Sequence, residues 1–173
     1  MNSIVILCGG TNCGKTATLR GFFRIDYSPR RRTYIQRVLK GKVVGAVSFG
    51  SPQEQEEYCN VKDVNKNIKE RIEICGNYTS GKPYILLIPF TMRGSSKRGE
   101  KINTECILKP IETLKRKFKV FIIYLRKVSS KNEERDALMK CLAPSITIET
   151  TPQDCDKSEE LERFLKQLVI RSQ

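Results

Sequence analysis

The chain has 173 residues, of which 39% are hydrophobic, so it is long enough to bury the core of one compact domain. It contains no histidine, which excludes histidine-based catalytic triads and histidine-ligated metals. Its 32 Lys and Arg residues outnumber its 19 Asp and Glu residues, and the net charge of +13 favours anionic partners such as nucleotides or nucleic acids. A lysine-rich solvated surface would give the same excess.

No apolar run approaches the roughly 20 residues that span a bilayer, and the N-terminus lacks the form of a signal peptide. We therefore expect a cytoplasmic protein that does not enter a membrane. The seven cysteines are scattered without a C-x-x-C pair, which predicts reduced thiols rather than disulfides or a zinc site. No linker or repeat divides residues 1–173, so we expect a single domain.

The chain opens with a short apolar run at residues 3–8, whose composition suits a buried parallel strand. Residues 15–23 have helical composition. Between them, residues 9–16 read GGTNCGKT and satisfy G-x-x-x-x-G-K-[ST] at every fixed position. A strand, a glycine-rich loop and a helix in this order predict a loop that binds the phosphates of a nucleotide.

The residues of this loop have distinct expected roles. Gly9 and Gly14 permit the backbone turns. Lys15 reaches the terminal phosphates, and the Thr16 hydroxyl supplies one oxygen ligand to Mg²⁺. The predicted nucleotide-binding residues are Gly9, Gly10, Thr11, Asn12, Cys13, Gly14, Lys15 and Thr16.

With GGTNCGKT as its Walker A motif, the chain resembles the P-loop NTPase superfamily. The resemblance implies that the protein binds ATP or another nucleoside triphosphate together with Mg²⁺. The motif is specific for the superfamily and does not identify a substrate.

Three consecutive cations, Arg30, Arg31 and Arg32, follow the first predicted helix. They are either a patch that contacts the phosphates of a partner or a plain solvated turn. Residues 33–39 and 43–49 flank a short glycine-containing connection, which predicts a hairpin with its first strand at the edge of the sheet.

The sequence from Ser51 to Glu54 is a capping box with proline at the first helical position, so a helix begins there. Apolar residues recur at helical spacing between 61 and 75, with a break expected near Asn60 and a C-cap at Gly76. Glu54 is also a candidate to orient an acceptor or a water molecule, besides its capping role.

Residues 84–90 form the next buried strand, at the place where P-loop proteins usually carry their Walker B aspartate. Thr91 stands there instead, as a candidate to hold a Mg²⁺-bound water. The glycine- and serine-rich basic stretch 93–101 predicts a mobile surface loop. It leaves the edge of the sheet at which ligands bind, so it is a candidate lid.

The rest of the chain alternates between helix-like and strand-like runs. We expect a helix that starts near Pro110 or a turn earlier, a strand at 120–125, a short helix at 132–142 and a strand at 145–149. The last helix has a clear apolar stripe from Leu161 to Val169, behind Asp156 and Ser158 as caps.

This alternation predicts an α/β three-layer sandwich, with helices on both faces of a mainly parallel sheet of about five strands plus an edge strand or hairpin. The layout resembles small nucleoside and nucleotide kinases, in which a lid supplies arginines to the transferring phosphates. The resemblance implies that Arg93, Lys97 and Arg98 are lid cations and that Arg135 is a further contact. The candidate catalytic residues are Lys15, Arg93, Arg98 and Glu54.

The sequence thus indicates a Mg²⁺-dependent ATP-binding protein, either a kinase-like phosphotransferase or an NTPase. A nucleotide-binding switch or a nucleic-acid-associated protein with little or no turnover is the alternative, because no aspartate ends the strand at 84–90.

Overall fold

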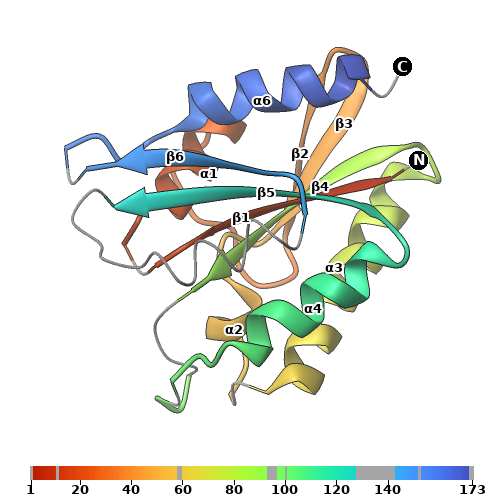
Figure 1. The fold of residues 1–173 in the computed structure, drawn as a ribbon. Helices are drawn as coiled ribbons and strands as arrows, with labels where there is room; N and C mark the ends of the chain where they lie inside the picture. Colours follow the sequence, from red (N-terminus) through yellow and green to blue (C-terminus); the bar gives the residue numbers. More distant parts are fainter. Residues whose placement is uncertain are drawn as a thin grey trace.

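The structure is a computed structural model that describes residues 2–10, 12–57, 60–92, 97–99, 101–127, 143–151 and 153–171. Within these ranges the predicted α/β class and the mainly parallel sheet are confirmed (Figure 1). The strands are β1 (Ser3–Gly9), β2 (Tyr34–Leu39), β3 (Lys42–Val47), β4 (Tyr84–Thr91), β5 (Lys119–Lys127) and β6 (Ser145–Thr150). The helices are α1 (Lys15–Phe23), α2 (Pro52–Gln55), α3 (Val61–Thr79), α4 (Glu105–Lys115) and α6 (Ser158–Arg171).

The described strands form one sheet in the order β2-β3-β4-β1-β5-β6. The predicted hairpin is confirmed, because β2 pairs antiparallel with β3 and lies at the edge. The other pairings are parallel, and β1 lies between β4 and β5. Every residue of β1 is buried, which is why its sequence is an apolar run without alternation.

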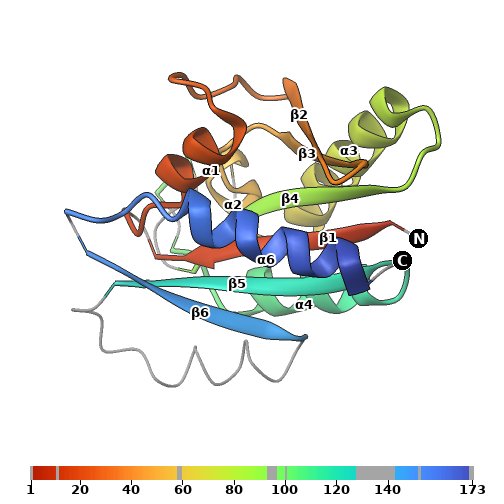
Figure 2. The ribbon, with the colours of Figure 1, turned by 90° about the horizontal axis from the view of Figure 1, so that it is seen from above.

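The two faces of the sheet carry different helices, as Figures 1 and 2 show. On β1, Ile4 and Ile6 pack with residues of α3 and α4, whereas Val5 and Leu7 pack with residues of α1 and α6. After β1 the chain continues to β2 and β3, which lie on one side of β1 in the sheet. After β4 it continues to β5, which lies on the other side of β1. Right-handed crossovers therefore send the helices that follow these neighbouring strands to opposite faces. Ligands bind at the carboxyl ends of strands at such a switch point.

The end of α3 differs from the expectation. The predicted C-cap at Gly76 is wrong, because the helix continues to Thr79 and the left-handed cap residue is Ser80, with φ 51°. Thr79 is buried and its hydroxyl donates to the carbonyl oxygen of Cys75 at 2.9 Å, so the buried face of the helix extends one turn further. The break near Asn60 is confirmed, and the Asn60 side chain accepts from the N–H of Asp63.

In the C-terminal half, α4 begins at Glu105, one turn before Pro110, and β5 and β6 cover the predicted strands. Asp156 accepts a hydrogen bond from the N–H of Ser158 at the start of α6, as expected of a cap. The helix predicted at 132–142 lies outside the described residues. Among the helices of the described ranges, none combines the length and the apolar character needed to cross a membrane.

Candidate functional site

The 9–16 loop connects the carboxyl end of β1 to α1, and the packing around it explains two of its glycines. Gly14 has φ 93°, a left-handed conformation, and a Cβ there would overlap the carbonyl oxygen of Cys155. A Cβ at Gly9 would lie 2.6 Å from the carbonyl oxygen of Leu125. Among the described residues outside its chain neighbours, none has an atom within 4 Å of a Cβ placed at Gly10, so in this loop the described surroundings require glycine at Gly9 and Gly14 and not at Gly10.

The Lys15 ammonium lies over this loop. Its Nζ donates to the carbonyl oxygen of Gly10 at 2.8 Å and to that of Gly9 at 3.1 Å, and it lies 3.7 Å from the Cys13 sulfur. The side chain is buried. Because these partners are neutral, the positive charge of Lys15 is available to an anion that enters the loop.

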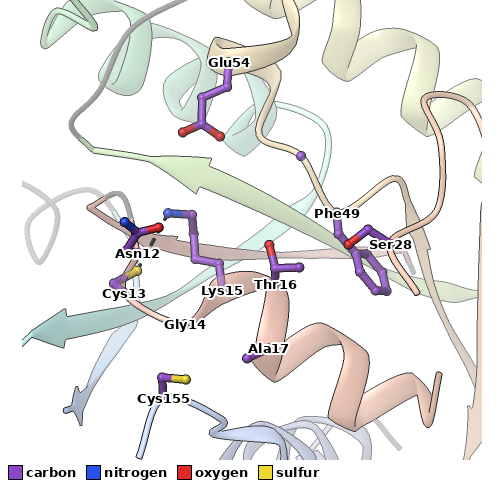
Figure 3. A pocket seen from close by; sticks show the side chains of 11 residues that line it. Asn12, Cys13, Gly14, Lys15, Thr16, Ala17, Ser28, Phe49, Glu54 and Cys155 are labelled. Atoms are coloured by element: carbon purple, nitrogen blue, oxygen red, sulfur yellow. Dashed lines mark hydrogen bonds between the residues drawn. The ribbon is translucent and has the colours of Figure 1, made fainter. Parts of the chain in front are cut away.

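A cavity of about 530 Å³ opens above the loop (Figure 3). It is lined by Asn12, Cys13, Gly14, Lys15, Thr16, Ala17, Ser28, Phe49, Gly50, Glu54 and Cys155. Among the described lining residues, Lys15 and Glu54 are the only ones with a formal charge. Figure 3 shows the Glu54 carboxylate on the opposite side of the cavity from α1, pointing toward Lys15 and Thr16.

The structure therefore brings Asn12, Cys13, Gly14, Lys15, Thr16 and Glu54 to one cavity. Gly9 and Gly10 belong to the same site through their contacts with Lys15. Thr11, Arg93 and Arg135 lie outside the described residues. Arg98 is not among the residues that line the cavity.

The connection between β6 and α6 packs against the 9–16 loop and the start of α1. Thr18 of α1 is fully buried, and its hydroxyl accepts from the N–H of Lys157 at 3.0 Å and donates to the carbonyl oxygen of Cys155 at 3.4 Å. The sequence did not single out Cys155 as a site residue. The available signal was its position, since the connection after a parallel strand emerges at the same edge as residues 9–16.

At the start of α2, Ser51 and Glu54 interact in a different way from the predicted capping box. The Ser51 hydroxyl donates to the Glu54 Oε2 at 2.8 Å instead of accepting from the Glu54 N–H, which donates to the Ser51 carbonyl oxygen. The expected side-chain cap is therefore wrong, whereas Pro52 is at the first helical position as predicted. The carboxylate oxygen accepts this hydrogen bond, which fixes the orientation of Glu54.

Behind α2, the buried side chain of Arg71 joins α3 to the segment that lines the cavity. Its guanidinium donates to the carbonyl oxygens of Val47 (2.8 Å) and Gly50 (2.7 Å) and to the side chains of Gln55 and Asn67 (2.7 Å each). Burial is the main cause that lowers the pKa of Arg71 to about 9. No role for Arg71 was predicted from the sequence. The available signal was its position three residues after Ile68, on the buried stripe of the helix.

The end of β4 carries no acid. Thr91 is fully buried, and its Oγ1 has no hydrogen-bond partner among the described residues. Gln53 covers this strand end: its Oε1 accepts from the Thr91 N–H, and its Nε2 donates to the carbonyl oxygen of Cys106, each at 3.4 Å. Thr91 does not line the cavity.

Several of the predicted phosphate-contacting cations are paired with acids. Arg31 lies 2.8 Å from Glu56, and Arg32 forms an ion pair with Glu70. Arg98 lies 3.5 Å from Glu57. These pairs reduce the positive charge that two residues of the 30–32 run present to an anionic partner.

The N–H groups of Lys97 and Arg98 donate to the carbonyl oxygens of Glu56 and Glu57, respectively. This part of the predicted lid is therefore hydrogen-bonded to the segment between α2 and α3. Residues 93–96 and 100 of the predicted lid lie outside the described residues, so its closure over the 9–16 loop stays a prediction.

Within the described residues, no group of three or more His, Cys, Asp or Glu side chains is arranged to hold a metal ion by itself. No protein-family model, curated protein or solved structure matches this chain. The function of the protein must therefore be inferred from its own residues.

Proposed function

We propose that this protein is a P-loop protein that binds ATP or another nucleoside triphosphate with Mg²⁺, and that it acts as a kinase-like phosphotransferase or an NTPase. The observation that carries the proposal is the cavity above residues 9–16, in which the Lys15 ammonium is bound only by neutral groups among the described residues. A buried cation over a glycine-rich loop at a helix N-terminus suits a polyphosphate.

The packing of the glycines supports the same proposal. Gly9 and Gly14 allow the loop to lie directly against Leu125 of β5 and Cys155 of the connection between β6 and α6, so these two segments hold its shape before any ligand binds. A preformed loop avoids the cost of ordering its backbone when the phosphates enter. The cavity volume of about 530 Å³ lies within the range typical of small-ligand sites.

The donors in the cavity fit Mg²⁺. Thr16 offers a hydroxyl, an oxygen ligand of the kind that Mg²⁺ binds, and Glu54 adds a carboxylate to the same cavity. When bound, the ion would neutralise charge on the terminal phosphates. Lys15 would stabilise the same negative charge, and the walls around Phe49 and Gly50 would limit the access of water. Arg93 and Arg98 remain the proposed lid cations.

Calorimetric titration of ATP and ADP, with and without Mg²⁺, tests the proposal. The folded parent should bind, and Lys15→Ala should weaken ATP binding by about tenfold or more, because a charge-assisted contact contributes about 1.5–3 kcal/mol. Lys69→Ala is the control, since Lys69 is 79% exposed on α3. A folded parent that binds no nucleoside di- or triphosphate would falsify the proposal.

A screen of phosphate acceptors with labelled ATP, run beside a hydrolysis control without acceptor, separates a phosphotransferase from an NTPase. Transfer of label to an acceptor identifies the former. Release of phosphate without an acceptor identifies the latter.

The second candidate function is a nucleotide-binding switch or nucleic-acid-associated protein with little turnover. The acid-free end of β4, where Thr91 is buried, is the observation that favours it. Binding of nucleic acid should weaken steeply as salt is added. Nucleotide binding without turnover in the acceptor screen would support this alternative.

A further inference from the structure

We propose that Glu54 of α2 supplies the carboxylate for the nucleotide-bound divalent cation, in place of an acid at the end of β4. The assignment presupposes that the protein binds a nucleotide, as proposed above. It gives Glu54 a defined chemical role, namely to accept hydrogen bonds from the water molecules that Mg²⁺ retains in protein sites.

The end of β4 cannot provide this carboxylate. Phe90, Thr91 and Met92 provide no carboxylate there. The hydroxyl of Thr91 is buried and does not reach the cavity lining, and Gln53 lies over the strand end through its bonds to Thr91 and Cys106.

The same contacts of Gln53 direct the next residue into the cavity. Successive residues of a helix are rotated by about 100° from one another. Because Gln53 is fully buried against β4 and the start of α4, Glu54 faces a different direction, and it lines the cavity opposite Thr16 (Figure 3).

A neutral side chain holds Glu54 in place, and no ion pair of Glu54 is found among the described residues. Ser51 donates to its Oε2 at 2.8 Å, and among the described residues its Oε1 has no hydrogen-bond partner. Arg71 fixes the neighbouring Gly50 and Gln55. The carboxylate is therefore oriented by its surroundings and keeps one oxygen for water molecules around a cation.

The rest of the cavity has the complementary groups. Thr16 provides a hydroxyl on the α1 side, and Lys15 lies between Thr16 and Asn12 in Figure 3. Glu54 is the only carboxylate among the described lining residues. A carboxylate placed alone beside a polyphosphate would repel it, whereas a cation between the two removes that repulsion.

The test measures how strongly Mg²⁺ strengthens nucleotide binding. The metal coupling is the dissociation constant in EDTA divided by that in saturating Mg²⁺, measured with fluorescent ADP and GDP analogues. Glu54→Gln should lower the coupling on the order of 10- to 100-fold, the effect expected when a group that hydrogen-bonds to the ligands of a metal ion is lost. Affinity in EDTA should stay the same or rise, because a negative charge beside the phosphates is removed.

Two controls make the test specific. Glu73→Gln makes the same chemical change on the exposed surface of α3, and Thr91→Val removes the competing hydroxyl. Both should keep the parental coupling. Glu54→Asp keeps the charge on a shorter side chain and should retain more coupling than Glu54→Gln. Thermal melts establish that each variant is folded.

The outcomes separate the two proposals. A folded parent that binds neither analogue, and neither ATP nor ADP in the calorimetric titration, refutes the proposed function and the role of Glu54 with it. A parent that binds, but whose coupling is unchanged in Glu54→Gln, overturns the role of Glu54 alone. Loss of coupling in Thr91→Val without loss in Glu54→Gln also overturns it, as does a parent that binds equally well with and without Mg²⁺.

Discussion

Replacement of Arg71 by methionine tests whether this arginine holds the cavity wall in place. The guanidinium donates four hydrogen bonds, three of which leave α3 for Val47, Gly50 and Gln55. Methionine preserves most of the apolar volume and removes every donor. The substitution therefore isolates the polar contribution of the side chain.

The size of the effect follows from these contacts. Hydrogen bonds to a charged group contribute at least about 1.5 kcal/mol each, so loss of four costs about 6 kcal/mol. The substitution also removes the cost of burying a cation, the burial that lowers the pKa of Arg71 to about 9. If this offsets about half of the loss, the free energy of unfolding falls by about 3 kcal/mol.

Urea denaturation at pH 7 measures this change, with Lys69→Met as the control on the exposed face of α3. The control should change stability by less than about 0.5 kcal/mol. Nucleotide affinity provides a second readout, because Gly50 lines the cavity. If Arg71→Met unfolds at the parental urea concentration with an unchanged m-value, the four hydrogen bonds do not hold this wall.

The remaining predictions concern backbone strain and pH. Gly14→Ala should lower the free energy of unfolding by about 2 kcal/mol in urea titrations, because of its φ of 93° and the overlap with a neighbouring carbonyl, whereas Gly10→Ala should be tolerated. Hydrogen bonds from Lys166 and then Arg37 lower the pKa of Glu162, so its stabilisation is present above the ordinary glutamate pKa and is lost as the pH falls through the lowered value. Glu162→Gln should therefore cost about 0.5–1 kcal/mol at pH 7 and progressively less as the pH falls below the ordinary glutamate range, and a cost that does not change with pH would contradict this explanation.

The elements with a strong local pattern were predictable from the sequence. The apolar run of β1, the glycine-rich loop and α1 each depend on residues that are neighbours in the chain, and α1 has the predicted bounds. The hairpin of β2 and β3 also follows from local turn chemistry. Glu54 could be named as a candidate because the capping pattern marked the start of a helix after β3.

The supports of the site were not predictable in the same way, because they depend on tertiary contacts. Gln53 and Cys106 are 53 residues apart in the chain, and Thr18 and Cys155 are 137 residues apart. No local pattern marks such pairs. Arg71 is an intermediate case: its place on the apolar stripe of α3 predicts burial, but not that its acceptors are main-chain carbonyls of another segment.

The charge of the cavity explains why metal and nucleotide should be coupled in this protein. The described lining contains one cation and one acid, Lys15 and Glu54, so its formal charge is zero although the whole chain carries +13. The general excess can attract a polyanion over a distance, but salt screens such attraction beyond about 8 Å at physiological ionic strength. In the proposed nucleotide complex, Lys15 and the loop amides would hold the phosphates against the carboxylate of Glu54. A divalent cation between the phosphates and the Glu54 carboxylate would attract both and remove their repulsion. Glu54 would then make nucleotide binding depend on the metal instead of preventing it.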